Sequence, residues 1–338
     1  MKIIFFEVPK VEQDFFSQAL SGMDVSFFEE KLNENNVNKA LDAEIISVFT
    51  NSVINKNIIN LLPNLKFINT SSTGFDHIDI NYCTEKGIKV SNVPAYGSQT
   101  VAEFTFALLL TLSRRIYWGY HQLREGTNFD LSQLEGFDLE GKTLGVIGTG
   151  KIGQNVIRIA KGFGMNVIAT DPHPKTELAK EFDFEYVSLE NLLSQADIVS
   201  VHVPYMPETH HLINSTNLAK IKKGAVLINT ARGEIVETEG LLVALSDGRI
   251  KAAALDVLEG ERDLKEERAI ISGSDPKIEQ MEKMRKLIED HILIDLPNVI
   301  VTPHMAFFTK EAVGRIMQTT VDNIKNFIAG KPENIVNK

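Results

Sequence analysis

Short apolar runs rich in β-branched residues alternate along the chain with segments whose apolar residues recur at helical spacing. In the first part of the chain this pattern predicts strands at Lys2–Phe6, Ala43–Phe49, Lys66–Thr70 and Ile88–Ser91. Helical periods at Phe15–Leu20 and Lys56–Leu62 fall between strands. Strands that alternate with helices are typical of an α/β unit, so residues 1–100 are expected to form a small one.

The same alternation continues on a larger scale from Lys142 to Thr302. Apolar strands are expected there at Lys142–Gly148, Asn166–Asp171, Asp197–His202, Ala225–Asn229, Ala252–Val257 and Val299–Thr302. Helical segments separate most of these strands. Strands joined by helices in this way predict an α/β fold with a doubly wound parallel sheet.

Three segments stand outside this alternation. Thr100–Arg115 predicts a long apolar helix, which suits a bridge between domains, a subunit interface or an ordinary core helix. Glu261–Ile294 is charged, with a helical period near Ile278–Ile288, and is expected to be a surface excursion, either a plain solvated segment or a lid. Thr309–Ile328 predicts an amphipathic helix.

Composition narrows the class of protein. The chain has 338 residues, enough for two domains, and a formal net charge of −10. That charge argues against nucleic acid as a partner, because a phosphate backbone calls for a basic surface. Cys83 is the only cysteine, so neither an intramolecular disulfide nor a thiolate zinc site can form. The longest apolar stretch, around Phe104–Leu112, falls far short of the roughly 20 residues that span a bilayer. We therefore expect a cytoplasmic protein with no membrane partner.

A glycine-rich turn carries the first chemical signal. Gly148, Gly150 and Gly153 match G-x-G-x-x-G between an expected strand and an expected helix, and Asp171 ends the next strand roughly 20 residues later. The glycines allow a tight turn, the approach of a pyrophosphate and close helix packing, and the helix N-terminus attracts the phosphates. Asp171 is placed to bind ribose hydroxyls and to repel a 2′-phosphate. The motif therefore predicts NAD rather than NADP, with a plain glycine turn as the alternative.

Polar residues also follow three later strands, in Asn229–Gly233, Asp256–Glu261 and Thr302–His304. Ligands of parallel sheets bind at these carboxyl ends. Hydride transfer to a carbonyl carbon needs a cation for a neighbouring carboxylate, a proton donor at the oxygen and a nicotinamide beside the carbon. An arginine, a histidine with a carboxylate partner and an NAD fold meet these needs.

These motifs, taken in order, resemble the D-isomer-specific 2-hydroxyacid dehydrogenase family over essentially the whole chain. The further runs that carry the resemblance are Ser72–Asp76, His202–Pro204 and Pro204–Thr209. Val93–Tyr96 and His304–Thr309 look most like the D-lactate dehydrogenase branch of that family.

The resemblance implies roles for the polar residues. Arg232 is expected to bind the substrate carboxylate through two parallel hydrogen bonds. His304 is expected to act as the general acid and base at the substrate oxygen. Glu261 is expected to pair with that histidine, and Asp256 to hold the nicotinamide carboxamide. The interval from Glu261 to His304 is longer than in compact family members, so Glu259 is an alternative partner.

Further residues are implied for the two binding sites, and no metal is expected in either. The predicted cofactor residues are Gly148, Gly150, Lys151, Ile152, Gly153, Asp171, Val203, Pro204, Thr209, Thr230, Ala231, Arg232 and Asp256. The predicted substrate residues are Thr73, Gly74, Tyr96, Arg232, His304 and Phe307. Tyr96 and Phe307 are expected to narrow the pocket against bulky substrates.

The resemblance also implies an architecture and an assembly. Both domains are expected to be doubly wound, Rossmann-like or flavodoxin-like. An NAD-binding domain of residues 101–305 is expected to be inserted into a discontinuous substrate domain of residues 1–100 and 306–338. A homodimer is expected through the helix around Phe104–Leu112.

The activity expected from the resemblance is that of an NAD-dependent D-2-hydroxyacid dehydrogenase, which moves a hydride between NADH and a small 2-oxo acid. Pyruvate and D-lactate are the favoured pair. Reduction of glyoxylate or hydroxypyruvate is one alternative. A non-enzymatic NAD(H)-sensing protein, like the co-repressors that resemble this family, is another, because those proteins keep similar residues. In an acidic chain, Arg232 is the local cation that an anionic 2-oxo acid requires.

Overall fold

The computed structural model describes residues 1–127, 129–261, 264 and 278–337. The chain forms two compact units. Unit 1 comprises Met1–Tyr96 and Phe308–Lys338, and unit 2 comprises Gly97–Phe307. The assignment of substrate binding to one unit and NAD binding to the other stays a prediction from the sequence.

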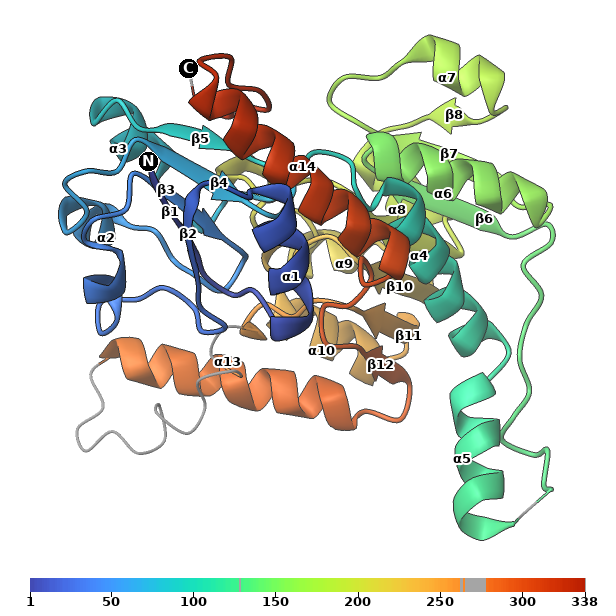
Figure 1. Ribbon diagram of the computed structural model, residues 1–338. Helices are drawn as coiled ribbons and strands as arrows, with labels where there is room; N and C mark the ends of the chain where they lie inside the picture. The colour runs from blue at the N-terminus through green and yellow to red at the C-terminus, as the bar shows by residue number, and fades with distance from the viewer. Residues whose placement is uncertain (128, 262–263, 265–277, 338) are drawn as a thin grey trace. The chain divides into compact units, whose positions relative to one another are not determined.

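Unit 1 is built on a five-stranded parallel sheet with the order β2-β1-β3-β4-β5 (Figure 1). This order is that of flavodoxin-like doubly wound folds. The strands are β1 Lys2–Phe5, β2 Asp24–Phe27, β3 Ile45–Val48, β4 Phe67–Thr70 and β5 Lys89–Ser91. Four of them coincide closely with the strands expected from the sequence. The fifth, β2, is an edge strand whose residues are at most half-buried, so it lacks the apolar run that marks the others.

The last helix of the chain belongs to unit 1. It is α14 Lys310–Ile328, which packs on β4 and on α1 Lys10–Ala19. The ring of Phe327 stacks on that of Phe67 with their centroids 4.3 Å apart. The other helical segments of unit 1 are η1 Val37–Ala40, α2 Lys56–Asn60 and α3 Ile80–Glu85. The C-terminal helix therefore covers the sheet that the N-terminal strands form.

Unit 2 contains a seven-stranded parallel sheet with the order β12-β11-β10-β9-β6-β7-β8. The strands are β6 Thr143–Ile147, β7 Asn166–Thr170, β8 Glu185–Tyr186, β9 Ile198–Val201, β10 Ala225–Asn229, β11 Ile250–Leu255 and β12 Val299–Val301. Apolar clusters lie on both faces of the sheet, which explains why its central strands are apolar throughout. The prediction of a doubly wound α/β sheet is confirmed, apart from the two-residue β8, which the sequence pattern did not reveal.

The helical segments of unit 2 connect these strands. They are α4 Ser98–Ser113, α5 Ile116–Gly126, α6 Lys151–Gly162, α7 Thr176–Glu181, α8 Leu189–Gln195, η2 Pro207–Thr209, α9 Ser215–Leu218, η3 Gly233–Ile235, α10 Thr238–Ser246 and α13 Ile278–Asp295. The expected surface excursion includes residues 262–263 and 265–277, which lie outside the described residues. The expectation of a lid falls on the same residues and stays a prediction. Within the described ranges, no helix is long and apolar enough to cross a membrane.

Much of the apolar surface of α4, where a dimer contact is expected, is covered within the chain. Phe106, Leu108, Leu109 and Leu112 are buried in the core of the same unit, where α4 packs against α6. These side chains are therefore already covered by their own chain, and α4 is a core helix over this stretch. The homodimer itself stays a prediction. Exposed apolar side chains occur instead on α5, which follows α4 and carries Tyr117, Tyr120 and Leu123.

Candidate active site

The glycine-rich turn follows β6, at the point where the strand order of the unit 2 sheet reverses. β6 pairs with β7 on one side and with β9 on the other. Gly148 has a φ of 95°, and a Cβ there would come within 2.8 Å of the His202 carbonyl oxygen. A Cβ at Gly153 would overlap the Gly148 carbonyl. The turn itself thus requires both glycines, and such reversal points are where open parallel sheets bind ligands.

Gly150 is the glycine that the packing does not require. It has an ordinary φ of −67°, and a Cβ there would meet nothing within 4 Å. It is the N-cap of α6, and no side chain in the described part of the chain caps this helix. The first N–H groups of α6 can therefore bind an anion, which the helix dipole also favours. The turn fits the pyrophosphate of a dinucleotide.

Asp171 follows β7 and bonds back to the glycine turn. Its Oδ2 accepts hydrogen bonds from the Thr149 backbone N at 2.7 Å and Oγ1 at 2.9 Å, and its Oδ1 accepts one from the His173 backbone N at 2.8 Å. Partial burial raises the pKa of Asp171, but these hydrogen bonds outweigh it and the net shift is downward. The side chain is therefore an ionised acceptor, as ribose binding requires.

The segment after β9 lies next to the glycine turn. Burial lowers the pKa of His202 to about 3, and its Nε2 is 2.7 Å from the Ser200 hydroxyl, which fits a neutral structural histidine. Thr209 Oγ1 donates to the Pro204 carbonyl at 2.7 Å and accepts from the Met206 N–H at 2.8 Å. This threonine thus closes the loop that carries several predicted cofactor residues.

The other predicted cofactor residues lie at the ends of neighbouring elements. They are Lys151 and Ile152 at the start of α6, Val203 after β9, and Thr230 and Ala231 after β10.

Arg232, Asp256 and His304 follow three neighbouring strands, β10, β11 and β12. Because all three strands are parallel, these residues lie along the same edge of the sheet. The Arg232 carbonyl accepts a hydrogen bond from the Asn229 side chain at 2.8 Å, and Arg232 Nη1 donates to the Ala231 carbonyl at 2.8 Å. The fold thus gathers the residues singled out from separate motifs.

His304 and Glu261 form a pair. Nδ1 of the imidazole is 3.1 Å from each carboxylate oxygen, and the two side chains are 27% and 24% exposed. An ionised carboxylate only accepts hydrogen bonds, so the proton belongs on Nδ1. Nε2 is then the nitrogen left to exchange a proton with a substrate oxygen.

Asp256 anchors the turn that carries His304. Its carboxylate is 1% exposed and accepts from Thr302 Oγ1 at 2.5 Å and from the backbone N–H groups of Met305 at 2.9 Å and Ala306 at 2.8 Å. Burial raises the pKa of Asp256, and these hydrogen bonds oppose the rise. Sequence reasoning missed this anchoring role. The available signal was an acidic residue directly after the apolar strand AAAL.

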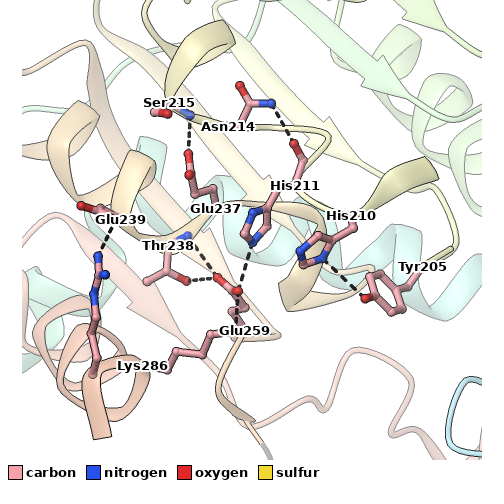
Figure 2. Close-up of polar contacts among 11 residues, drawn as sticks. Tyr205, His210, His211, Asn214, Ser215, Glu237, Thr238, Glu239, Glu259 and Lys286 are labelled. Atoms are coloured by element: carbon pink, nitrogen blue, oxygen red, sulfur yellow. Dashed lines mark hydrogen bonds and ion pairs between the residues drawn. The ribbon is translucent and has the colours of Figure 1, made fainter. Parts of the chain in front are cut away.

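Glu259 does not contact His304. Its side chain, 5% exposed, is bound to His211 Nε2 at 3.0 Å, Lys286 Nζ at 2.8 Å and Thr238 Oγ1 at 3.0 Å (Figure 2). Burial raises the pKa of Glu259, but the bonds to Lys286 and His211 prevail and bring it down to about 2. Of the two candidate glutamates, the structure therefore pairs Glu261 with the histidine. The cluster around Glu259 was not foreseen from the sequence.

The predicted substrate residues Thr73 and Gly74 lie in unit 1, in the loop after β4. Thr73 Oγ1 donates to the Val93 carbonyl at 2.9 Å, and the Asn92 side chain donates to the Thr73 carbonyl at 2.8 Å. A buried polar network lies behind the loop and ties it to α14. Its members are Ser47, Asn69, Ser71, Ser91, Thr320 and Asn323.

The two predicted aromatic residues of the pocket belong to different units. Tyr96 is half-buried at the end of the first segment of unit 1, where its carbonyl accepts a hydrogen bond from Arg315 Nε at 2.7 Å. Phe307 is the last residue of unit 2 and is also half-buried. The described residues contain no group of three or more histidine, cysteine, aspartate or glutamate side chains that could hold a metal ion.

Comparison with known proteins places this geometry in context. Residues 106–306 match the sequence model of the family "D-isomer specific 2-hydroxyacid dehydrogenase, NAD binding domain". The chain is 35% identical to D-lactate dehydrogenase of Escherichia coli strain K12, over 98% of each protein. It is 37% identical to glyoxylate reductase of Aeropyrum pernix strain K1, over 89% of this chain and 85% of the relative. The structure of D-lactate dehydrogenase from Aquifex aeolicus, complexed with NAD and lactic acid, matches with a TM-score of 0.89 at 35% identity, over 100% of this chain and 99% of the other. These similarities span both units.

Proposed function

The chain belongs to the D-isomer specific 2-hydroxyacid dehydrogenase family and is an NAD-dependent oxidoreductase, and from that premise we propose that it reduces pyruvate to D-lactate. The observation that carries the proposal is the contact between His304 and Glu261. These two residues and Arg232 follow neighbouring strands of one parallel sheet. The relatives reported above are named dehydrogenases and reductases, which favours an enzyme over the non-enzymatic sensor.

Arg232 binds the anionic end of the substrate. Its guanidinium offers two parallel N–H groups that match a carboxylate, and its charge draws electron density onto the neighbouring carbonyl oxygen. In a chain of net charge −10, this local cation is what attracts a small 2-oxo acid.

When bound, NADH would supply the hydride for the C2 carbon of the substrate. His304 donates a proton from Nε2 to the carbonyl oxygen as that oxygen gains charge, and it takes the proton back in the reverse direction. Glu261 accepts the Nδ1 hydrogen bond, keeps Nε2 directed outward and stabilises the charged imidazole.

Pyruvate is favoured as the substrate by the similarity to two proteins named D-lactate dehydrogenase. Tyr96 and Phe307 stay predicted to narrow the pocket against bulky substrates. Glyoxylate is the second candidate, because a relative named glyoxylate reductase shares 37% sequence identity with this chain. Thr73 and Gly74, in unit 1, stay predicted substrate residues.

The test is oxidation of NADH with a panel of 2-oxo acids, comprising pyruvate, glyoxylate, hydroxypyruvate, phenylpyruvate and 2-oxoisocaproate. We expect the highest kcat/KM with pyruvate and formation of the D enantiomer of lactate, measured by chiral chromatography. A higher kcat/KM with glyoxylate or hydroxypyruvate would replace the proposed substrate, and turnover of none would refute the activity.

A matched pair of histidine variants tests the proton donor. His304→Asn should lower kcat for pyruvate reduction by at least about a hundredfold, because general acid catalysis is worth that much. NADH binding, measured by fluorescence, should stay within about threefold, since the imidazole contributes mainly when the proton moves. His210→Asn, on an exposed residue, should behave as wild type. Near-normal turnover by the His304 variant would contradict the mechanism.

A further inference from the structure

The short segment that carries Glu261 is packed against the loop that carries Arg232. This segment, Leu258–Glu261, follows β11. A Cβ at Gly233 would overlap the backbone of Leu258 and Glu259, so only a glycine allows this approach. Any outward shift of the segment would therefore separate the Arg232 loop from Glu261.

The Glu259 side chain fixes the segment from a second side. It contacts a polar cluster made of Thr238 at the start of α10, His211 after η2 and Lys286 on α13 (Figure 2). At 5% exposed, Glu259 would be an unpaired buried charge without these partners. Within the described residues, Lys286 is the lysine that forms an ion pair with Glu259.

Gly260 is held by the same helix. Asp290 lies one turn after Lys286 on α13 and is fully buried. A Cβ at Gly260 would overlap its Oδ2, so the glycine backbone lies directly against the carboxyl group. Lys286 and Asp290 therefore contact two successive residues of the segment that precedes Glu261.

We propose that α13 is a positioning element for the reaction, in which Lys286 and Asp290 hold Glu259 and Gly260 so that the Glu261 carboxylate stays against His304. The proposal assigns neither residue a contact with substrate or cofactor, so both act through Glu261. This inference rests on the proposed function, because it assigns α13 a role in orienting the proton donor.

A double-mutant cycle tests whether Lys286 acts through Glu261. Lys286→Met should lower kcat for pyruvate reduction by about tenfold or more, since a misplaced catalytic group can cost up to about a hundredfold. Glu261→Gln alone should lower kcat at least as much. The double variant should be no slower than Glu261→Gln, because the carboxylate that Lys286 positions is already gone. If the loss of kcat in the double variant equals the product of the two single losses, the proposal is overturned.

Two variants separate positioning from general damage to the fold. Lys286→Arg keeps the cation and should restore most of kcat. Arg285→Gln is the matched control on the same helix, because Arg285 pairs with Glu239 and Glu289 at the surface, and its kcat should equal that of wild type. If Lys286→Met does not fold, Glu259→Gln replaces it in the cycle with the same expected result. An equal loss in Arg285→Gln would count against the proposal.

Hydrogen–deuterium exchange gives a result that does not depend on activity. In the intact protein, Lys286→Met should speed exchange of the peptide that contains Leu258–Glu261 by about tenfold or more, while Arg285→Gln leaves it unchanged. If no 2-oxo acid is turned over but exchange accelerates, the proposed substrate chemistry fails, and the proposal that α13 positions the Leu258–Glu261 segment is supported. Unchanged exchange in the Lys286 variant would refute that positioning role.

Discussion

Asp256 holds His304 in a backbone conformation that non-glycine residues seldom adopt. The His304 N–H donates to the Asp256 carbonyl at 2.9 Å, and the Asp256 carboxylate accepts from the N–H groups of the next two residues. His304 has a φ of 53°, a left-handed conformation that costs roughly 1–2 kcal/mol for a residue with a Cβ. The hydrogen bonds to Asp256 offset this cost, so the end of β11 fixes the direction of an imidazole that follows β12.

Replacing Asp256 by asparagine tests this anchoring role against the carboxamide role expected from the family resemblance. An amide NH2 group would face a backbone N–H donor, which removes one hydrogen bond and places two donors together. We expect Asp256→Asn to lower kcat at least about tenfold and the free energy of unfolding by roughly 2 kcal/mol, with the Kd for NADH within about threefold. Asp295→Asn, on an exposed residue, is the control. A large rise in the Kd for NADH with little change in kcat would favour the carboxamide role.

The glycine turn allows a clean separation of cofactor binding from folding. Gly150→Ala should leave the melting temperature within about 2 °C, because its φ is −67° and a Cβ would meet nothing within 4 Å. The Kd for NADH should rise at least about tenfold, since the methyl group fills the approach to the pyrophosphate. Titration of NADH fluorescence measures this.

Gly162→Ala is the matched control for that variant. Gly162 lies at the other end of α6, and a Cβ there also meets nothing within 4 Å. Alanine should leave the Kd for NADH unchanged and stabilise the helix by about 0.5–1 kcal/mol. Equal affinities in the two variants would mean that the pyrophosphate does not approach Gly150.

The pattern of apolar positions predicted most strands because buried parallel strands are continuous apolar runs. It missed β2 because the residues of this strand are at most half-buried and form no apolar run, and it missed β8 because that strand is two residues long. The apolar run of α4 predicted a covered helix but could not tell what covers it. The answer, α6 of the same unit, depends on a contact that sequence periodicity does not encode.

The candidate site shows a similar division. Motifs pointed to Arg232, Asp256 and His304, and the parallel order of β10, β11 and β12 explains why separate motifs meet at one sheet edge. Spacing alone could not choose between Glu259 and Glu261. That choice depends on Lys286, which binds Glu259 from α13, a helix that begins within the charged excursion Glu261–Ile294.

Asp171 should decide which dinucleotide the protein uses. Asp171→Ala removes the ribose acceptor and the negative charge, so the Kd for NADH should rise about tenfold while that for NADPH changes less or falls. The same change frees the N–H and hydroxyl of Thr149, so a small loss of stability is expected too. Asp183→Ala, whose side chain is 97% exposed, is the control. An unchanged ratio of the two dissociation constants would contradict the role of Asp171.

Asp290 should make stability fall as the pH rises. Burial raises the pKa of its carboxyl from 3.8 to about 7, with the charges of Glu259 and Glu289 adding to the shift and the Gly260 backbone and Lys286 opposing it. Between pH 4 and pH 7 the folded chain keeps this proton while the unfolded chain has lost it, so folding becomes less favourable with rising pH and levels off above 7.

Asp290→Asn measures that effect, because asparagine keeps the shape against Gly260 and does not ionise. Urea unfolding at several pH values should show the variant more stable than wild type at pH 8 by on the order of 2 kcal/mol, with the advantage disappearing near pH 4. Asp295→Asn, at the exposed end of the same helix, should show no such trend. A difference between Asp290→Asn and wild type that stays constant with pH would mean that the carboxyl does not titrate in this range, and the burial of Asp290 would then have to be balanced by a partner of opposite charge.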